Sequence, residues 1–152
     1  IYRRTQLVGE KENAKQYVID DFAHNPSEVA AAIAACQLIS PRVIAYFQPH
    51  GFGPLRFMHA ELSQEVAKVL RPNDYFLIGD VYYAGGTVDR NISPTIVSTA
   101  IIREGKQAHY VGNKQGALTE MITLAQENTT FLIMGARDPH LDQLAKDLLK
   151  RL

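Results

Sequence analysis

Strand and helix signals alternate along almost the whole chain, and this alternation constrains the fold more than any other feature. Short stretches rich in β-branched and aromatic residues are separated by longer segments in which apolar residues recur at helical spacing. Such alternation is typical of parallel sheets. We therefore expect an α/β fold with a Rossmann-like, open, mostly parallel six-stranded sheet and helices on both faces. The expected strands are 4–8, 17–19, 43–47, 75–78, 108–111 and 131–134. The expected helices are 29–39, 62–70, 93–103, 118–125 and 138–149.

Length and charge limit the function. A chain of 152 residues fits one domain, which we expect to span 1–152. Sixteen basic and sixteen acidic residues cancel, so no overall field favours nucleic acid or an acidic membrane as partner. The single cysteine, Cys36, excludes an internal disulfide and suits a reducing cytosol, and no apolar run is long enough to span a bilayer. Because the chain starts at Ile1 without a signal-peptide pattern, we expect a cytoplasmic fragment or processed product.

The run from Asp20 to Glu28 predicts a strand-to-helix turn that binds an anion. Asn25 is a good N-cap, Pro26 suits the first helical position, and Glu28 stands where a capping box places its carboxylate. Free backbone N–H groups at the helix start would favour a phosphate. Asp21 is then the natural partner of a ribose, and His24 of a phosphate oxygen; the alternative is that Asp21 only supports the cap.

Two long connections, 48–57 and 80–92, and a shorter turn at 135–138 follow the carboxyl ends of other expected strands. Ligands bind at that edge of an open α/β sheet, and long connections there usually carry function. We therefore expect all of these turns, together with the turn at 20–28, to lie on one rim.

Several common chemistries have no motif in this sequence. It contains no G-x-x-x-x-G-K-[ST] loop, G-x-S-x-G, H-E-x-x-H or C-x-x-C, and the five histidines lack metal-ligand spacing, so we expect no metal site. Asp20, Asp21 and Asp80 invite comparison with phosphoacceptor receiver domains, which gather carboxylates around magnesium. The lysine that such domains carry after the last strand is replaced here by Gly135, Ala136 and Arg137.

The turn resembles one in the C-terminal domain of the Mur ligases and the related folylpolyglutamate synthases. Residues 21–26, Asp-Phe-Ala-His-Asn-Pro, match the family's D-G-A-H-N-P. Phe-Gln-Pro-His at 47–50, Asp-Val-Tyr-Tyr-Ala-Gly at 80–85 and Met-Gly-Ala at 134–136 resemble the branch that joins L-alanine to UDP-N-acetylmuramate. The sister enzymes that join a whole tripeptide to the same precursor also vary the loop after residue 50, but they lack the Phe-Gln-Pro-His start. Arg3 and Arg4 resemble the paired arginine at the junction with the central domain. These matches run through nearly the full chain in the family's order.

The resemblance implies a role in peptidoglycan precursor synthesis or recycling. In this family a central domain holds ATP and magnesium, a carboxylate of the sugar precursor is activated as an acyl phosphate, and an amine takes the acyl group. The C-terminal domain closes over that site. By resemblance, the nucleotide would be bound by Arg4, Asp21, His24 and Asn25, and the amino substrate by His50, Arg56, Gly135, Ala136 and Arg137. No residue of this domain is expected to be catalytic, and alone, without the N-terminal and central domains, it is expected to be inactive.

One departure concerns the amino substrate. Alanine-adding enzymes carry three arginines in the loop after the second crossover strand, and the first two fall on Gly51 and Pro54 here. Only the third has a counterpart, Arg56. A guanidinium clamp on a carboxylate cannot be replaced by glycine or proline, so the amino acid or peptide added is left open. A free-standing nucleotide-binding or small-molecule-binding module without catalysis is the alternative function.

Overall fold

The computed structural model describes residues 5–83, 91–136 and 138–152. Its six strands form one sheet in the order β1-β2-β6-β3-β4-β5; β1 is antiparallel to β2 and the others run parallel. The strands are β1 (Gln6–Lys11), β2 (Gln16–Asp21), β3 (Arg42–Phe47), β4 (Tyr75–Gly79), β5 (Gln107–Gly112) and β6 (Thr129–Met134). The helices are α1 (Pro26–Gln37), α2 (Phe52–Val69), α3 (Thr95–Arg103), α4 (Lys114–Leu124) and α5 (Leu141–Arg151), with a 3-10 turn at Glu12–Ala14. The expected fold class is confirmed.

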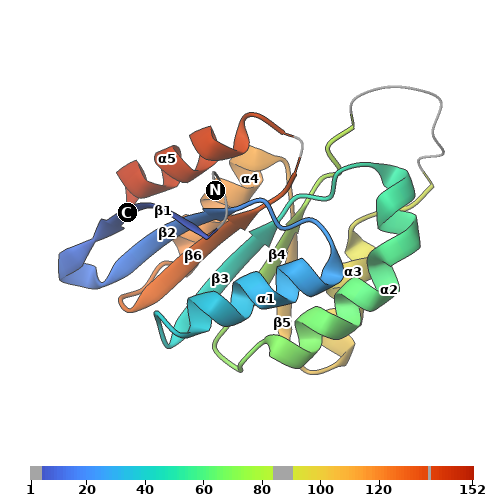
Figure 1. Cartoon of the computed structure of the whole chain (residues 1–152), viewed down its shortest axis with the longest axis horizontal. Helices are drawn as coiled ribbons and strands as arrows, with labels where there is room; N and C mark the ends of the chain where they lie inside the picture. Colours follow the sequence, from blue (N-terminus) through green and yellow to red (C-terminus); the bar gives the residue numbers. More distant parts are fainter. Residues whose placement is uncertain (1–4, 84–90, 137) are drawn as a thin grey trace.

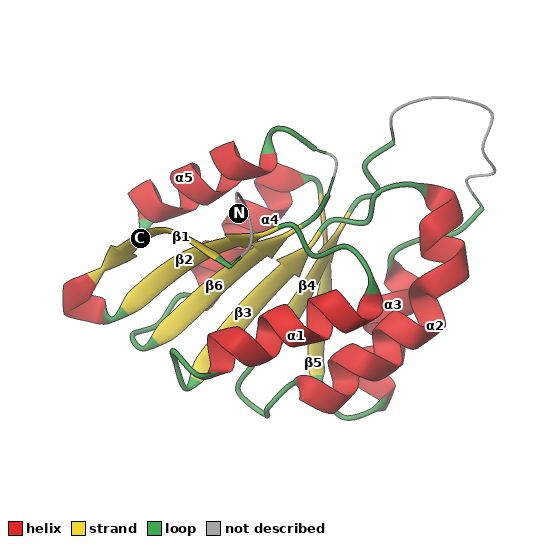
Figure 2. Cartoon of the chain, viewed as in Figure 1, coloured by secondary structure: helices red, strands yellow, loops and turns green. Residues whose placement is uncertain are grey.

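Helices cover both faces of the sheet (Figure 1). Helices α1, α2 and α3 pack on one face and α4 and α5 on the other, as the colouring by secondary structure also shows (Figure 2). Successive residues of a central strand point alternately to the two helix layers. In β3, Val43, Ala45 and Phe47 face the three-helix layer. Ile44 and Tyr46 face the two-helix layer. This two-sided burial explains why these strands read as continuous apolar runs.

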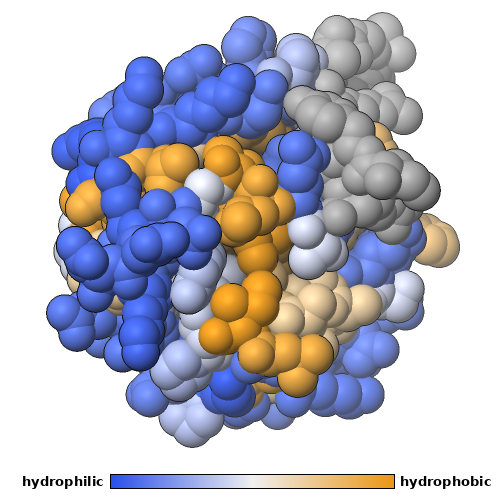
Figure 3. Space-filling view, turned by 60° about the vertical axis from the view of Figure 1, so that its left-hand side comes forward, coloured by the Kyte–Doolittle hydropathy of each residue, from blue (hydrophilic) through white to orange (hydrophobic). Residues whose placement is uncertain are grey.

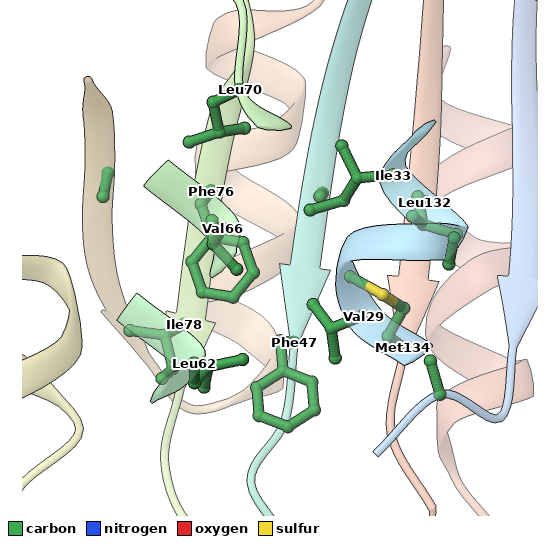
Figure 4. Close-up of a cluster of buried hydrophobic side chains, with 14 of the residues drawn as sticks. Val29, Ile33, Phe47, Leu62, Val66, Leu70, Phe76, Ile78, Leu132 and Met134 are labelled. Carbon is green, nitrogen blue, oxygen red and sulfur yellow. The ribbon is translucent and has the colours of Figure 1, made fainter. Parts of the chain in front are cut away.

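The larger core lies between the sheet and the three-helix layer. Figure 4 shows Val29 and Ile33 of α1 and Leu62 and Val66 of α2 pointing toward side chains of the sheet. Phe47 and Phe76 stack there with ring centroids 6.3 Å apart. The stripe expected at 62–70 is thus core packing on the sheet.

The helices start at other residues than expected, and two of these differences affect the site. Helix α2 begins at Phe52, so the connection predicted for 48–57 is only Gln48 to Gly51. Pro54 suggested a loop, but a proline in the first helical turn replaces an N–H that has no intrahelical acceptor, so the helix tolerates it. Helix α5 begins at Leu141 with His140 as N-cap, two residues later than Asp138 predicted. Asp138 instead binds the His140 N–H at 2.8 Å.

At the amino ends of the parallel strands, opposite the rim formed by their carboxyl ends, Asp74 links several elements through hydrogen bonds. Its carboxylate is fully buried and accepts the backbone N–H of Val43 at 2.8 Å, the side-chain amide of Gln37 at 2.9 Å, and the guanidinium and backbone N–H of Arg71. Burial alone would raise the pKa of Asp74, but the hydrogen bonds from Arg71, Val43 and Gln37 lower it. The cluster joins α1, β3 and the α2–β4 turn, so it serves the fold.

The surface mixes polar and apolar regions. Figure 3 shows apolar atoms gathered in the middle of one face between strongly polar areas. Exposed large apolar side chains over the described residues include Phe57 and Leu38, which are 93% and 91% exposed. Within the described ranges, no helix has both the length and the apolar character needed to cross a bilayer.

Candidate functional site

The carboxyl ends of the parallel strands meet on one rim, where loops from different strands touch. Gln48, after β3, donates its backbone N–H to the carbonyl of Met134 at the end of β6, at 3.0 Å. Tyr82, after β4, donates its backbone N–H to the Pro49 carbonyl at 2.7 Å. The rings of His24, after β2, and His50, after β3, lie 5.4 Å apart. The expectation that these turns share one rim is therefore met for the residues that the structure describes.

The β2–α1 turn has the predicted cap but not the full capping box. Asn25 is the N-cap and accepts the Glu28 N–H at 3.0 Å, as expected, whereas the Glu28 carboxylate accepts the N–H of His24, one residue before the cap, at 3.2 Å. Since Pro26 has no N–H and the cap uses that of Glu28, Ser27 carries the one first-turn donor that the cap does not use. The helix start therefore offers an anion fewer backbone donors than we expected, and the carboxylate of Glu28 lies beside them.

Asp21 lies under this turn rather than on it. Its carboxylate is 5% exposed and accepts the backbone N–H and hydroxyl of Thr5, at 2.7 and 2.9 Å, and the Ala23 N–H at 2.8 Å. A carboxylate has about four lone-pair positions. Three are used by these donors, so Asp21 ties the start of β1 to the turn and retains room for roughly one further donor.

A pocket of about 400 Å³ opens between the start of α1 and the first half of α2. Its volume falls in the range of small-molecule sites. Its lining combines imidazole, amide, hydroxyl and carboxylate groups with apolar side chains: His24, Asn25, Pro26, Ser27, His50, Pro54, Phe57, Met58 and Glu61. His24 Nδ1 lies 3.2 Å from the Glu28 carboxylate. Three of the predicted site residues, His24, Asn25 and His50, are therefore brought together.

Gly51 makes the sharp turn into α2. It caps the helix with φ 104° and ψ 145°, a backbone conformation that residues other than glycine rarely adopt. The arginine that alanine-adding enzymes carry at this position would be strained here. Helix α2 can therefore start at Phe52, two residues after His50, which brings Pro54, Phe57 and Met58 to the pocket.

The end of β6 forms a second part of the rim, beside Gln48. A Cβ at Gly135 would lie 2.6 Å from Leu141 Cδ1 and 3.4 Å from Gln48 Cβ, so glycine permits the close approach. Asp138 follows, with a carboxylate that accepts Gln48 Nε2 at 3.0 Å and the Lys114 ammonium. Burial by itself would raise the pKa of Asp138, but its bonds to Lys114, His140 and Gln48 lower the pKa to about 2.

Other predicted residues are placed differently. Arg56 is an exposed residue of α2 and is not among those lining the pocket. Gly135 lies on the rim next to Gln48, and neither it nor Ala136 lines the pocket. Arg4 and Arg137 lie outside the described residues.

Sequence reasoning missed two groups. Pro54, Phe57, Met58 and Glu61 were missed because the helix was expected to start later; their i, i+3, i+4, i+7 spacing is the signal that could have found them. The cluster of Gln48, Lys114 and Asp138 joins positions up to 90 residues apart, and no local pattern signals it.

The arrangement offers no obvious cation site. Across the described ranges, no three or more His, Cys, Asp or Glu side chains are grouped as a metal would require. The carboxylate cluster of a phosphoacceptor receiver therefore has no counterpart among these residues. The donor set suits binding of a polar, partly planar ligand: imidazoles, amide and hydroxyl groups beside proline, phenylalanine and methionine side chains.

Comparison with known proteins gives the family. A model of the Mur ligase glutamate ligase domain matches residues 3–137. The UDP-N-acetylmuramate–L-alanine ligase of Pelotomaculum thermopropionicum is 34% identical over 152 residues, which cover 99% of this chain and 31% of that protein. The chain thus spans less than a third of the length of this curated relative.

Solved structures share the fold. The UDP-N-acetylmuramate–alanine ligase of Thermotoga maritima superimposes with a TM-score of 0.70 at 24% identity, over 99% of this chain and 30% of that one. A murein peptide ligase of Psychrobacter arcticus gives 0.70 at 17% identity, again over 99% and 30%. At these identities, the likeness shows the fold alone. Taken with the family model and the 34% identical relative, the chain belongs to the Mur ligase family, as its C-terminal, glutamate ligase domain.

Proposed function

We propose that residues 1–152 form the C-terminal domain of an ATP-dependent amide ligase that joins L-alanine or a peptide to UDP-N-acetylmuramate. The domain would close over ATP held by a central domain and would bind the incoming amino substrate. The observation that carries this proposal is the pocket at the strand carboxyl ends, where His24, Asn25 and His50 converge from two motifs of the family. The printed activity of the relative from Pelotomaculum thermopropionicum supports the same reaction class.

The nucleotide side of the site would consist of Arg4, Asp21, His24 and Asn25. The exposed edge of the His24 ring, the Asn25 amide and the Ser27 N–H supply donors at the positive end of α1. Asp21 could accept one ribose hydroxyl through its remaining lone pair while keeping Thr5 and Ala23 bound. ATP would activate the carboxylate of the sugar precursor for attack by an amine. This domain would help to bind and orient ATP and would exclude water from the site.

Magnesium would be held mainly by the central domain. The described residues of this chain contain no carboxylate or histidine cluster of the kind that binds a divalent cation. A folylpolyglutamate synthase with this fold, from Yersinia pestis, was crystallised with AMPPNP and Mn, which suits nucleotide and metal binding in such ligases. Its identity of 13% limits that comparison to the fold.

The amino substrate would meet His50, Arg56, Gly135, Ala136 and Arg137. Gly51 and Pro54 occupy positions where alanine-adding enzymes carry arginines, and the Gly51 backbone conformation is unsuited to an arginine. Of the three arginine positions in this loop, only that of Arg56, on α2, would then provide a guanidinium to bind the carboxylate of the amino substrate. We expect a compound whose binding depends less on an arginine clamp, such as a peptide with further contacts. We propose that this reaction takes place in the cytoplasm. The proposed partners are the small-molecule substrates and the other domains of the same protein, without nucleic acid or a membrane.

Phosphate release by the full-length protein that contains this chain tests the proposal. With ATP, magnesium and UDP-N-acetylmuramate, release should begin only when an amino compound is added, and L-alanine and the tripeptide should be compared. The 152-residue chain alone should release none. Turnover by the chain alone would contradict the division of labour. Nucleotide binding without turnover by the full-length protein would favour the alternative of a binding module without catalysis.

A further inference from the structure

Asp138 is a fully buried charged group on the rim. Its side chain is 0% exposed and lies on the connection between β6 and α5. One carboxylate oxygen accepts Gln48 Nε2 at 3.0 Å and the Lys114 ammonium; the other accepts the His140 N–H at 2.8 Å. These donors come from the end of β3, the start of α4 and the start of α5. A single carboxylate thus joins the end of a central strand to both helices of the two-helix layer.

Gln48 transmits this anchoring to the substrate loops. Its backbone N–H binds the Met134 carbonyl at 3.0 Å, and Gly135 packs against its Cβ and carbonyl. The next residue, Pro49, accepts the Tyr82 N–H at 2.7 Å, and His50 pairs with Tyr82 in a short parallel bridge. Moving Gln48 would therefore shift the turn at Gly135 and the turn at His50 together.

Lys114 is a charged partner of Asp138, and its hydrogen bond, with those of His140 and Gln48, lowers the pKa of the buried carboxyl group. A buried carboxylate without a compensating charge and hydrogen bonds is strongly disfavoured. The Lys114 side chain is 36% exposed, so it reaches the carboxylate from the surface at the start of α4. Because the Asp138 carboxylate itself is wholly buried, it cannot touch a substrate. Any effect on the reaction must pass through Gln48 and the turns it holds.

We propose that Asp138, held by Lys114, is a positioning residue for the amino-substrate side of the site. Through Gln48 it fixes the turn at Gly135 and Ala136 against the turn at His50, so that both present one preformed surface. This inference rests on the proposed function, since it takes these turns to receive the amino substrate. A displacement of about 1 Å in such a turn can lower a rate on the order of a hundredfold.

Steady-state kinetics of the full-length ligase test the inference. Asp138→Asn keeps the shape of the side chain but removes its charge, and Lys114→Gln removes the partner charge at a half-exposed position. Both should raise the KM for the amino substrate by about tenfold or more, while the KM for ATP changes less than about twofold. Lys114→Arg should restore most of the affinity. Asp142→Asn, on the first turn of α5, is the matched control and should behave as wild type.

A second measurement separates loop coupling from a general loss of stability. Hydrogen exchange on the 152-residue chain should show faster exchange at Gln48 and Tyr82 in Asp138→Asn, but unchanged exchange at Val43, which Asp74 holds at the opposite edge. Equal rises in both KM values, or uniformly faster exchange, would contradict the positioning role. A wild-type enzyme that joins no amino compound to UDP-N-acetylmuramate would overturn the proposed function and this inference together. An active wild type with unchanged variants would overturn this inference alone.

Discussion

The carboxylate of Asp21 accepts both the backbone N–H and the hydroxyl of Thr5, at 2.7 and 2.9 Å. These two bonds fasten the start of β1 to the end of β2, directly beneath the turn that carries His24. Asp21 therefore has a structural task in addition to the proposed contact with a ribose. The two tasks predict separate effects on stability and on nucleotide use.

Replacing Asp21 with alanine should affect both tasks. We expect the free energy of unfolding to fall by roughly 2–3 kcal/mol, because the N–H groups of Thr5 and Ala23 lose a charged acceptor. Thr5→Val removes only the hydroxyl bond and should cost about 1 kcal/mol. Urea unfolding of the 152-residue chain measures both. In the full-length protein, Asp21→Ala should also raise the KM for ATP, and an unchanged KM would speak against the ribose contact.

Acid stability should depend on Asp138. Its pKa of about 2 in the folded protein lies below the ordinary value, so its contribution is complete above pH ~5 and is lost as the pH falls through about 2. The shift corresponds to at most about 2 kcal/mol. Unfolding of wild type and Asp138→Asn should be compared between pH ~2 and ~6. The stability difference should shrink toward acid; a difference that stays constant over this range would contradict the assigned ionisation.

The thiol of Cys36 should be inert in the folded chain. Its side chain is fully buried in α1, and burial, with a smaller contribution from the charge of Asp21, raises its pKa to about 12. The thiolate is the reactive species, so thiol reagents at neutral pH should label Cys36 only at the rate of unfolding. Rapid labelling of native protein, measured by mass spectrometry, would show that α1 opens locally.

Arg56 tests the amino-substrate assignment. It is an exposed residue of α2, so removal of its side chain should leave stability nearly unchanged. In the full-length ligase, Arg56→Ala should raise the KM for the amino substrate about tenfold and leave that for ATP unaltered. Arg103→Ala, which removes another exposed arginine, at the end of α3, provides the control. Identical kinetics in the two variants would remove Arg56 from the site.

The fold was predictable because the local patterns and the packing agree. The strands expected at 43–47 and 75–78 are observed as Arg42–Phe47 and Tyr75–Gly79, since residues buried on both faces of a sheet give an unmistakable apolar run. The N-cap at Asn25 was equally predictable, because a helix cap and the proline that follows it are local in sequence.

The parts of the site that could not be predicted depend on tertiary contacts. The burial of Asp21 follows from Thr5 folding over it, and the anchoring of Asp138 requires Gln48 and Lys114 from distant elements. The early start of α2 was hidden by Gly51 and Pro54, which favour turns but also suit the beginning of a helix. Local sequence patterns do not show which distant residues will contact one another in the folded chain.

The most direct measurement of the central claim compares two histidine variants of the full-length protein. His24 lies in the rim pocket with Asn25 and His50, whereas His59 lies farther along α2, beside α3. We predict that His24→Ala raises the KM for ATP at least severalfold and that His59→Ala leaves it as in wild type. An unchanged KM for ATP in His24→Ala, or an equal rise in both variants, would contradict the assignment of His24 to the nucleotide.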